Sequence, residues 1–570
     1  MPTFIKPGFW EKKQKGYDHW LNLDQLITGL VPSGPIEYNA NATGIQPVLG
    51  TNDASGINST IGGGVTNTAS GGCSTIGGGC LNTTSNPYAT VSGGISNLAS
   101  GYFSTIGGGQ SNTSSGDCAT VGGGVSNTAS CFHSTVGGGV SNIASGECST
   151  VGGGGTNTAY STFSTISGGQ GNTTSGGCST VSGGANNIAS CNFATIGGGN
   201  FNIACNSYST VGGGLFNTAS NTYTTIGGGF CNTASGGRST IGGGCYNTAN
   251  NSYSTISGGA NNSSSGLIST VGGGAANTAS GERSTISGGS ANTASAYYST
   301  IGGGGSNIAS GCFAKIGGGK YNNASATYSN VNGGWCNITN SRFSTINGGQ
   351  RNIVQSPTNE CCSLGVTIGG GIGHNTTGGT FNATTGNLTG AITCCNAGKL
   401  STISGGFRNC AIGSYSTIGG GRANTASTYG TTISGGCTNT ASNLASTVGG
   451  GFFNTASGGR STVSGGRSNV ASGGCSIIGG GFVNTASGYF TIVGGGGSNT
   501  ASGTYSAILG GSSNTTNTCD CAMIVGSNIT ADRACATFVN NLSIKNIPTS
   551  AAGLPSGSIW RSGTSVCIVI

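Results

Sequence analysis

The chain has 570 residues, of which 118 are glycine and only 5% are charged, whereas an ordinary soluble domain has roughly 25% charged residues. With 9 prolines and no Gly-X-Y period it is not collagen-like, and its charges are too few for charge-driven disorder. The 11 acidic residues and 3 histidines argue against a carboxylate-based or histidine-based active site. We therefore expect neither an enzyme nor a bound cofactor.

Charge and hydropathy exclude two further kinds of partner. The net charge of +7 is spread over scattered residues instead of a basic run, which argues against nucleic-acid binding. No apolar stretch reaches the roughly 20 residues of a membrane helix, so we expect no membrane span. The N-terminal residues also lack the apolar run of a signal peptide, and we expect a chain that is not exported by its own leader.

Residues 1–55 precede the repeat that fills most of the chain and are rich in aromatic residues. A short aromatic-rich end before a long repeat is typical of a docking segment that anchors the chain to another protein. The alternative is a plain cap on the first repeat. The residues expected to form the anchor are Phe9, Trp10, Tyr17 and Trp20.

A 15-residue repeat fills residues 56–352 and 403–516. We number its positions from 0, the Ile or Val of the Ser-Thr-Ile/Val step, which falls at Ile61, Ile76 and every fifteenth residue to Ile346. Position 0 is always Ile or Val, positions 2 and 3 are always Gly, position 6 is always Asn, and position 8 is small. The first segment holds 20 repeats and the second holds 8.

This period is too short for a helical repeat and suits one coil of a parallel β-solenoid. The β-branched residues of the Ser-Thr-Ile step favour a strand, and the Gly pair supplies a turn with positive φ. The sequence therefore predicts an all-β fold, a parallel β-roll or β-solenoid whose equal positions stack at ~4.8 Å per coil. Alternation along the strands predicts that positions 0 and 13 point inward and that positions 12 and 14 point outward.

The invariant Asn at position 6 is expected to face inward with the small residue at position 8. We expect it to form a ladder of amide–amide hydrogen bonds between coils. The alternative is that Asn holds a left-handed turn conformation, which it tolerates well. The ladder begins with Asn67, Asn82, Asn97, Asn112 and Asn127.

Position 12 carries a long column of aromatic residues. One Ile or Val and one Ala per coil bury too little surface to balance the ordering of the coil, so we expect another surface to cover the coils. An outward aromatic column is then either the interface of a homotrimeric rod or a ladder that binds a ligand. Its members include Tyr88, Phe103, Phe163, Phe193, Tyr208, Tyr223, Tyr253 and Phe343.

The repeat resembles the head repeats of trimeric autotransporter adhesins. The shared order is Ala69, Gly71, Ser74, Ile76 and Gly77, and it recurs in phase through both repeat segments. The resemblance implies a left-handed parallel β-roll wound into a homotrimer. The period of 15, the Asn column and both ends of the chain depart from that family, so its mode of secretion is not implied.

Residues 353–402 break the period, and we expect a loop or a small excursion from the roll, which is a candidate contact site. The stretch contains Cys361, Cys362, Cys394 and Cys395. No His or second Cys pair lies at zinc-binding spacing from these or other cysteines, so we expect no metal site.

Two cysteine pairs elsewhere lie 14 residues apart, which places the partners on neighbouring coils, one position apart. Their Cα atoms are then about 6 Å apart, within the disulfide range. Free thiols are the alternative, favoured if the chain assembles in a reducing cytoplasm. The predicted disulfides are Cys191 with Cys205 and Cys231 with Cys245.

Residues 517–570 leave the period and are expected to form a cap or tip. The segment from Asn546 to Gly557, with its Asn-Ile-Pro-Thr-Ser and Gly-Leu-Pro steps, resembles the closing segment of phage and large-virus fibre proteins. An apolar hairpin follows, predicted to pair residues 559–560 with 566–568.

The repeat and these resemblances predict a structural protein. They imply a viral tail or capsid fibre in the virion, attached to other virion proteins at its N-terminus and able to contact a host-surface glycan or protein. The alternative is a non-viral extracellular filament whose Asn-X-Ser/Thr sequons carry glycans. Ice binding through the Thr of position 14 is a third and weaker hypothesis, because only one rank of Thr is present.

Overall fold

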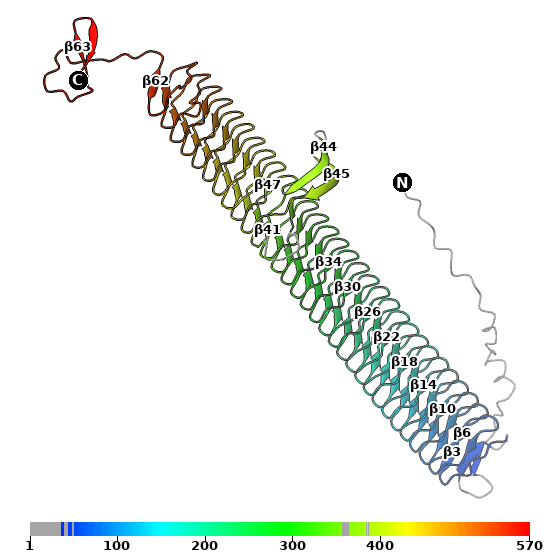
Figure 1. Ribbon diagram of the computed structural model, residues 1–570. Coiled ribbons are helices and arrows are strands. Elements are labelled where there is room, and N and C mark those ends of the chain that lie inside the picture. Colours follow the sequence, from blue (N-terminus) through cyan, green and yellow to red (C-terminus); the bar gives the residue numbers. More distant parts are fainter. Residues whose placement is uncertain (1–35, 39–43, 48–50, 356–363, 383–384, 386) are drawn as a thin grey trace. The chain divides into compact units, whose positions relative to one another are not determined.

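The computed structural model describes residues 36–38, 44–47, 51–355, 364–382, 385 and 387–570. The described residues form strands and turns and contain no helix. They divide into two compact units, Met1–Arg283 and Ser284–Ile570, and each unit is built from stacked coils (Figure 1). The predicted anchor residues lie outside the described residues: Phe9, Trp10, Tyr17 and Trp20.

The first unit begins with a small strand pair that leads into the stack. Strands β1 (Ile36–Tyr38) and β2 (Gly44–Pro47) pair in an antiparallel manner. Strand β2 then pairs in parallel with β3 (Ser59–Ile61), with Gly44 opposite Ser59. Coil stacking therefore starts before residue 56, where the period becomes readable in the sequence.

Two series of short strands build the rest of the first unit. The odd-numbered strands from β5 (Thr75–Ile76) to β31 (Thr270–Val271) carry positions 14 and 0. The even-numbered strands from β4 (Thr68–Ala69) to β32 (Thr278–Ala279) carry positions 7 and 8. Within each series, neighbouring strands pair in parallel at an offset of 15 residues. The predicted parallel β-solenoid is therefore confirmed.

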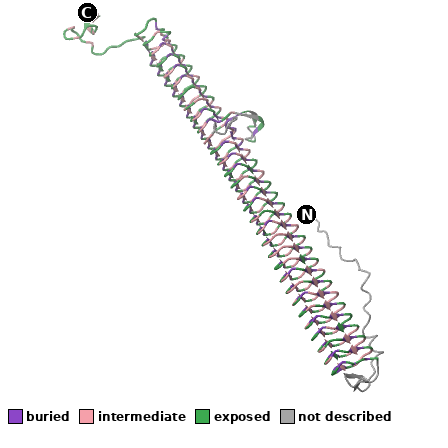
Figure 2. Ribbon diagram, turned by 60° about the horizontal axis from the view of Figure 1, so that its bottom comes forward, coloured by how far each residue is buried: buried purple, intermediate pink, exposed green. Residues whose placement is uncertain are grey.

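Each coil closes its own interior with side chains of one chain. Positions 0, 6, 8 and 13 have no exposed surface, as in Val136, Asn142, Ala144 and Ser149 (Figure 2). The inward direction predicted for positions 0 and 13 is correct, because these residues alternate with the partly exposed Thr of position 14. A second chain is not needed to cover this interior, so coil size alone no longer argues for a trimer.

The turn after each odd-numbered strand needs glycine at one of its two invariant positions. Gly139, at position 3, has a φ of +92°, and a Cβ there would collide with the carbonyl oxygen of Gly154 on the next coil. A Cβ added to Gly138, at position 2, would have its nearest neighbour at 3.9 Å, an ordinary van der Waals distance. Glycine is invariant at position 3 because a side chain there would need a left-handed φ and would collide with the next coil. In this coil, no steric contact explains why position 2 is also glycine.

The second unit repeats the same two series up to residue 354. One series runs from β33 (Thr285–Ile286) to β41 (Thr345–Ile346), and the other from β34 (Thr293–Ala294) to β42 (Ile353–Val354). The next coil begins with β43 (Thr367–Ile368), which pairs in parallel with β41. The stack therefore continues into the region where the sequence loses its period.

A hairpin accounts for the break in the period. Strands β44 (Thr376–Asn382) and β45 (Asn387–Cys394) pair in an antiparallel manner and project from the coils of the second unit (Figure 1). The chain then resumes with β46 (Thr402–Ile403), which pairs in parallel with β43. The predicted excursion is thus a β-hairpin inserted into one coil. Cys361 and Cys362 lie outside the described residues.

The two series then continue toward the end of the stack. Even-numbered strands run from β46 to β60 (Ala507–Ile508) and odd-numbered strands from β47 (Cys410–Ala411) to β59 (Thr500–Ala501). Strands β61 (Met523–Val525) and β62 (Thr537–Val539) follow β60 in parallel. Stacking therefore passes residue 516, where the 15-residue period ends in the sequence.

The last two strands form the hairpin predicted from the sequence. Strand β63 (Ile559–Ser562) pairs with β64 (Ser565–Ile568) in an antiparallel manner, with Ile559 opposite Ile568. The two residues between the strands are Gly563, with a φ of +60°, and Thr564.

Candidate interaction surface

The Asn residues of position 6 form a hydrogen-bonded ladder inside the coils. Asn142 Oδ1 accepts the main-chain N–H of Asn157 at 3.0 Å. Asn142 Nδ2 donates to the carbonyls of Gly138 at 2.8 Å and Gly154 at 2.9 Å. Each amide therefore bonds to the turn of its own coil and to the backbone of the next, and it gives the buried N–H of Asn157 a partner.

This ladder differs from the predicted one in its partners. Amide–amide hydrogen bonds occur only in some coils, as between Asn157 Nδ2 and Asn142 Oδ1 at 3.1 Å. The left-handed conformation offered as the alternative belongs to the preceding residue, since Thr156 has a φ of 52°. The predicted members all lie in the ladder: Asn67, Asn82, Asn97, Asn112 and Asn127.

The ladder has two members that sequence reasoning missed. Asn52 Oδ1 accepts the N–H of Asn67 at 2.9 Å, although Gln46 occupies position 0 of its coil. At the hairpin, His374 takes the place of Asn: its N–H donates to Asn352 Oδ1 at 3.0 Å, and its Nδ1 accepts from the N–H of Asn409 at 3.2 Å. A spacing of 15 before Asn67 was the available signal for Asn52, whereas the irregular region hid His374.

Burial lowers the pKa of His374 to about 4, even though the carbonyl-rich turn around it favours the charged ring. Its Nε2 is buried and forms no hydrogen bond. Because Nδ1 accepts a hydrogen bond, the ring is neutral with its proton on Nε2. His374 therefore forms fewer hydrogen bonds than the Asn that occupies this position in the other coils.

The Asn ladder also limits which sequons can carry a glycan. Sequon residues Asn82, Asn112 and Asn337 are buried in it, and the Nδ2 atom that would carry a glycan donates to two glycine carbonyls in each case. A glycan at these positions is incompatible with the coil. The sequons that remain exposed among the described residues include Asn58, Asn528 and Asn541.

Two columns of residues with left-handed backbone lie on the outside of the coils. We call the residues at position 12 the first corner column and those at position 5 the second corner column. Tyr208 in the first has a φ of 58° and Phe216 in the second a φ of 57°. Each donates its N–H backward, Tyr208 to Asn192 and Phe216 to Asn200 of the preceding coil. The side chains therefore project outward at a backbone strain of roughly 1 kcal/mol each.

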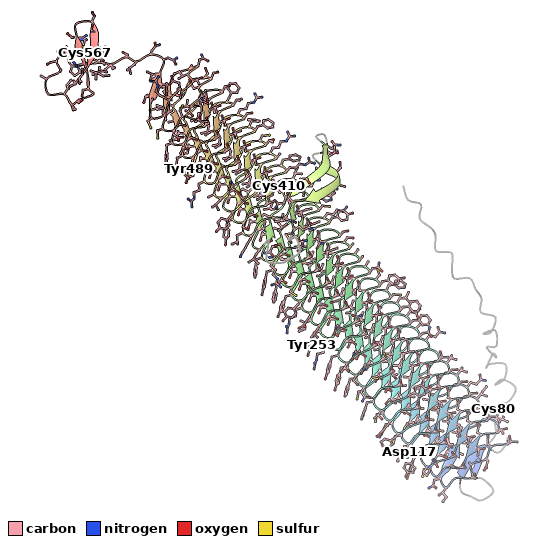
Figure 3. The ribbon with its side chains drawn as sticks, in the orientation of Figure 1. Cys80, Asp117, Tyr253, Cys410, Tyr489 and Cys567 are labelled. Atoms are coloured by element: carbon pink, nitrogen blue, oxygen red, sulfur yellow. The ribbon has the colours of Figure 1, made fainter. Side chains whose placement is uncertain are left out.

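The first corner column carries stacked rings in the first unit. Phe193 stacks on Tyr208 at 4.9 Å between centroids, and Tyr208 stacks on Tyr223 at 4.7 Å. Arg238 follows, with its guanidinium 5.4 Å from the ring centroids of both Tyr223 and Tyr253. Its Nη1 donates to Tyr253 Oη at 2.6 Å. Four aromatic rings and one cation thus form a continuous stack over five coils. Its last member, Tyr253, is labelled in Figure 3.

The second unit has a similar stack. Tyr298, Phe313, Tyr328 and Phe343 stack in that order, with centroids 4.8 to 5.3 Å apart and ring planes within 7° of parallel. Because each inner ring contacts its neighbours through both faces, the free surface of the stack consists of ring edges and hydroxyl groups. A ligand that stacks on ring faces, as a sugar does, finds few free faces here.

The other predicted column members have different surroundings. Tyr88 stacks on Phe103 at 4.7 Å, while Phe163 lies in the column between Cys148 and Cys178. The predicted outward direction is correct throughout: these side chains are about half exposed, for example 48% for Tyr223 and 59% for Phe163. The column is a half-exposed aromatic surface on a coil that needs no further covering.

The second corner column is a surface that sequence reasoning missed. Phe201 stacks on Phe216 at 5.1 Å, and both are nearly half exposed. Aromatic residues recur at the same position as Tyr246, Tyr321 and Phe453. Their 15-residue spacing was visible, but Ser, Thr and Ala occupy most other coils at this position and weaken the pattern.

The predicted disulfide pairs are free thiols in this structure: Cys191, Cys205, Cys231 and Cys245. The S–H of Cys191 donates to the carbonyl oxygen of Cys205 at 3.1 Å. Burial, followed by the nearby Cys191, raises the pKa of the Cys205 thiol. A different pair is in contact: Cys410 Sγ and Cys395 Sγ are 3.1 Å apart.

Within the described residues, no three His, Cys, Asp or Glu side chains gather as metal ligands would. That part of the chain likewise has no helix that is long and apolar enough to cross a membrane. The chain matches neither a model of a known protein family nor a curated protein.

Proposed function

We propose that the protein is a structural fibre of a virus, extending from a tail or capsid, and that it performs no catalysis. The observation that carries the proposal is the self-sufficient coil, whose four buried positions and Asn ladder repeat through each unit. Such a stack lengthens coil by coil without a new core, as an extended spacer requires. The closing segment from Asn546 to Gly557, with its resemblance to fibre proteins, supports the viral assignment.

We assign the chain a homotrimeric state, with the first corner column at the contact between copies. The column offers ring edges, hydroxyls and the cation of Arg238 along many coils, and a threefold axis would bury one such stripe per chain. The residues before the repeat would attach the trimer to other virion proteins, and the far end would meet a glycan or protein of the host surface.

Two measurements test this function. Mass spectrometry of purified virions should find the chain, and antibodies against the repeat should label a projecting fibre in electron micrographs. Light scattering on the full chain should give three times the chain mass. Absence from virions contradicts the viral fibre, and a stable monomer contradicts the trimer.

A matched pair of variants locates the contact. Changing Tyr208 and Tyr223 to Ser removes rings from the first corner column and should yield monomers. Changing Phe201 and Phe216 to Ser removes rings of similar exposure, backbone conformation and stacking from the second corner column, and the trimer should persist. The reverse result would move the contact to the second corner column.

A non-viral extracellular filament is the second candidate. The exposed sequons Asn58, Asn528 and Asn541 favour it, because a glycan there would not disturb the coils. Glycopeptide mapping of the protein from its natural source distinguishes the two. Occupied sequons together with absence from virions would support the filament.

A further inference from the structure

The β44–β45 hairpin lies against its parent coils through several contacts. Leu388 of β45 is fully buried, and an added Cβ on Gly373 would come within 2.8 Å of its Cδ2. Arg351 Nη1 donates to the carbonyl of Gly390 at 2.9 Å. These contacts hold the hairpin beside the coils. The base of the hairpin, where the chain leaves the coil and returns to it, is fixed by other residues.

Two cysteines meet at this base. Cys395 follows β45 directly, and its N–H donates to the carbonyl of Asn375 at 2.8 Å. Cys410, labelled in Figure 3, lies in β47 on the coil that follows. It is only 7% exposed. Their sulfur atoms are already 3.1 Å apart in this backbone conformation.

The contact between the two sulfur atoms makes this pair suitable for a disulfide. The 15-residue offset is not the coil register here, because the inserted hairpin separates paired residues of these two coils by 35 positions, as with Thr367 and Thr402. The hairpin instead returns Cys395 to Asn375, whose own N–H donates to Asn409, the residue before Cys410, at 2.9 Å. Cys521 and Cys535 also share a side-chain hydrogen bond, which raises the pKa of Cys521, but both are exposed, whereas Cys410 is buried.

We propose that Cys395 and Cys410 form a reversible disulfide under oxidising conditions. This disulfide links the end of β45, the second strand of the hairpin, to the next coil. The oxidant is a small disulfide of the glutathione type. This inference concerns the chain itself and holds whichever assembly the chain forms.

The reaction proceeds in two exchanges. The Cys395 thiolate attacks one sulfur of oxidised glutathione, forming a mixed disulfide and releasing one glutathione thiolate. Cys410 then loses its proton and attacks the Cys395 sulfur, which releases the second glutathione thiolate and leaves the Cys395–Cys410 disulfide. The thiol pair gives up two electrons and two protons, and one molecule of oxidised glutathione takes up both to become two molecules of reduced glutathione. Excess reduced glutathione reverses both steps.

The surroundings of the two thiols set the order of attack. The S–H of Cys410 donates to Cys395, which lowers the pKa of Cys395 to about 7. The same hydrogen bond, followed by burial, raises the pKa of Cys410. Cys395 is also the more exposed of the two. It is therefore the attacking thiolate, and Cys410 is the resolving thiol.

The test uses the full chain, reduced, desalted and then exposed to oxidised glutathione. Free thiols are alkylated, and the unreduced digest is analysed by mass spectrometry. We expect one linked peptide pair containing Cys395 and Cys410, with Cys191 and Cys205 alkylated. Because Cys394 shares a peptide with Cys395, Cys394→Ser is the matched control and should keep the link, whereas Cys395→Ser should lose it. A link that survives in Cys395→Ser, or no link in the unaltered chain, overturns the proposal.

Single variants test the order of attack. In Cys410→Ser, the mixed disulfide of Cys395 with glutathione should accumulate, because the resolving thiol is gone. In Cys395→Ser, Cys410 should acquire glutathione far more slowly. Equal modification rates at the two cysteines would overturn the assignment of Cys395 as the attacking thiol.

Hydrogen exchange tests the effect on the hairpin. Amides of β44 and β45 should exchange severalfold more slowly in the oxidised chain than in the reduced chain, while the coil amides of β48 (Thr417–Ile418) and β50 (Thr432–Ile433) stay unchanged. The double variant Cys395→Ser/Cys410→Ser should not respond to oxidant. Identical hairpin exchange in both redox states would show that the disulfide does not hold the hairpin.

Discussion

Asn217 Oδ1 accepts the main-chain N–H of Asn232 at 3.0 Å, one coil further along the stack. The Nδ2 of Asn217 donates to the carbonyls of Gly213 at 3.0 Å and Gly229 at 2.9 Å. One amide therefore bonds to one buried N–H and two part-buried carbonyls in two coils. This arrangement explains why position 6 holds only Asn in the regular repeats, since a hydrophobic residue would leave the buried N–H of Asn232 without a partner and would remove a hydrogen bond from each carbonyl.

Replacing this amide should destabilise the coil. In Asn217→Ala, the buried N–H of Asn232 loses its partner, which costs about 1–3 kcal/mol. The two glycine carbonyls each lose one hydrogen bond, although Gly229 keeps the N–H of Leu215. We expect a lower melting temperature and faster hydrogen exchange at Asn232 and its neighbours. Exchange in coils far along the same unit should not change, because coils contact only their neighbours. Unchanged exchange at Asn232 would contradict the role of the ladder.

Asn217→Asp should be worse than Asn217→Ala at neutral pH. The carboxylate keeps an acceptor for Asn232 but loses both N–H donors, and it places a buried charge opposite two carbonyl oxygens. Burial raises the pKa of this carboxyl in the folded chain above the ordinary value, so stability is retained at low pH and lost as the pH rises. Thermal melting from acid to neutral pH measures this, and a variant that melts independently of pH would contradict the prediction.

Gly139→Ala should damage the turn, whereas Gly138→Ala should not. The first substitution combines a φ of +92° with a collision between the new Cβ and the next coil, which we expect to cost roughly 3 kcal/mol. The second places its methyl group at an ordinary van der Waals distance from its nearest neighbour. The two changes are adjacent and chemically identical, so their melting temperatures compare the turn geometry directly. Equal effects would mean that the coil does not approach its neighbour as closely as described.

His374 should make the second unit less stable at mildly acidic pH. The unfolded chain titrates this ring near pH 6.5, whereas burial lowers the folded pKa to about 4. Between these values the unfolded state binds more protons, so stability falls as the pH drops from about 6.5 to about 4, by roughly 3 kcal/mol in total. Chemical denaturation across this range measures the slope.

His374→Asn is the control for that titration. Asn should restore the amide donors that the other coils direct at the equivalent glycine carbonyls, so the variant should be more stable than the original chain at every pH. The part of the pH slope that belongs to His374 should also vanish. A slope that persists unchanged would assign the titration to another group.

The buried serines of position 13 should fall into two classes. Ser104 Oγ is buried without a hydrogen bond, and both flanking coils carry Ala at this position, Ala89 and Ala119. Ser104→Ala should therefore be neutral or stabilising by up to ~1 kcal/mol. Ser134 Oγ instead donates to the carbonyl of Cys131 at 2.7 Å and accepts its N–H at 3.1 Å, so Ser134→Ala should be destabilising by a similar amount. Melting temperatures that move in the same direction would contradict this division.

The outward direction of the position 12 side chains was predicted correctly, but for an incomplete reason. Strand alternation predicted that Tyr208 points outward, and it does. The residue is not in a strand, however, but at a left-handed corner with a φ of 58°, where it donates its N–H to the preceding coil. Sequence alone favours Gly or Asn at such a φ, so an aromatic residue gives no local sign of it. The inter-coil hydrogen bonds impose this conformation.

The amino-acid sequence by itself determined the coil and its interior, because a strict period with Ile or Val at position 0 and small residues at position 8 has one way to bury them, as Val136 and Ala144 show. Only the tertiary structure decided where the backbone turns left-handed, how His374 replaces Asn in the ladder, and that Cys395 meets Cys410. The left-handed corners depend on hydrogen bonds between successive coils, and the other two features depend on contacts at the inserted hairpin. A repeat period carries no information about the register of residues that interrupt it.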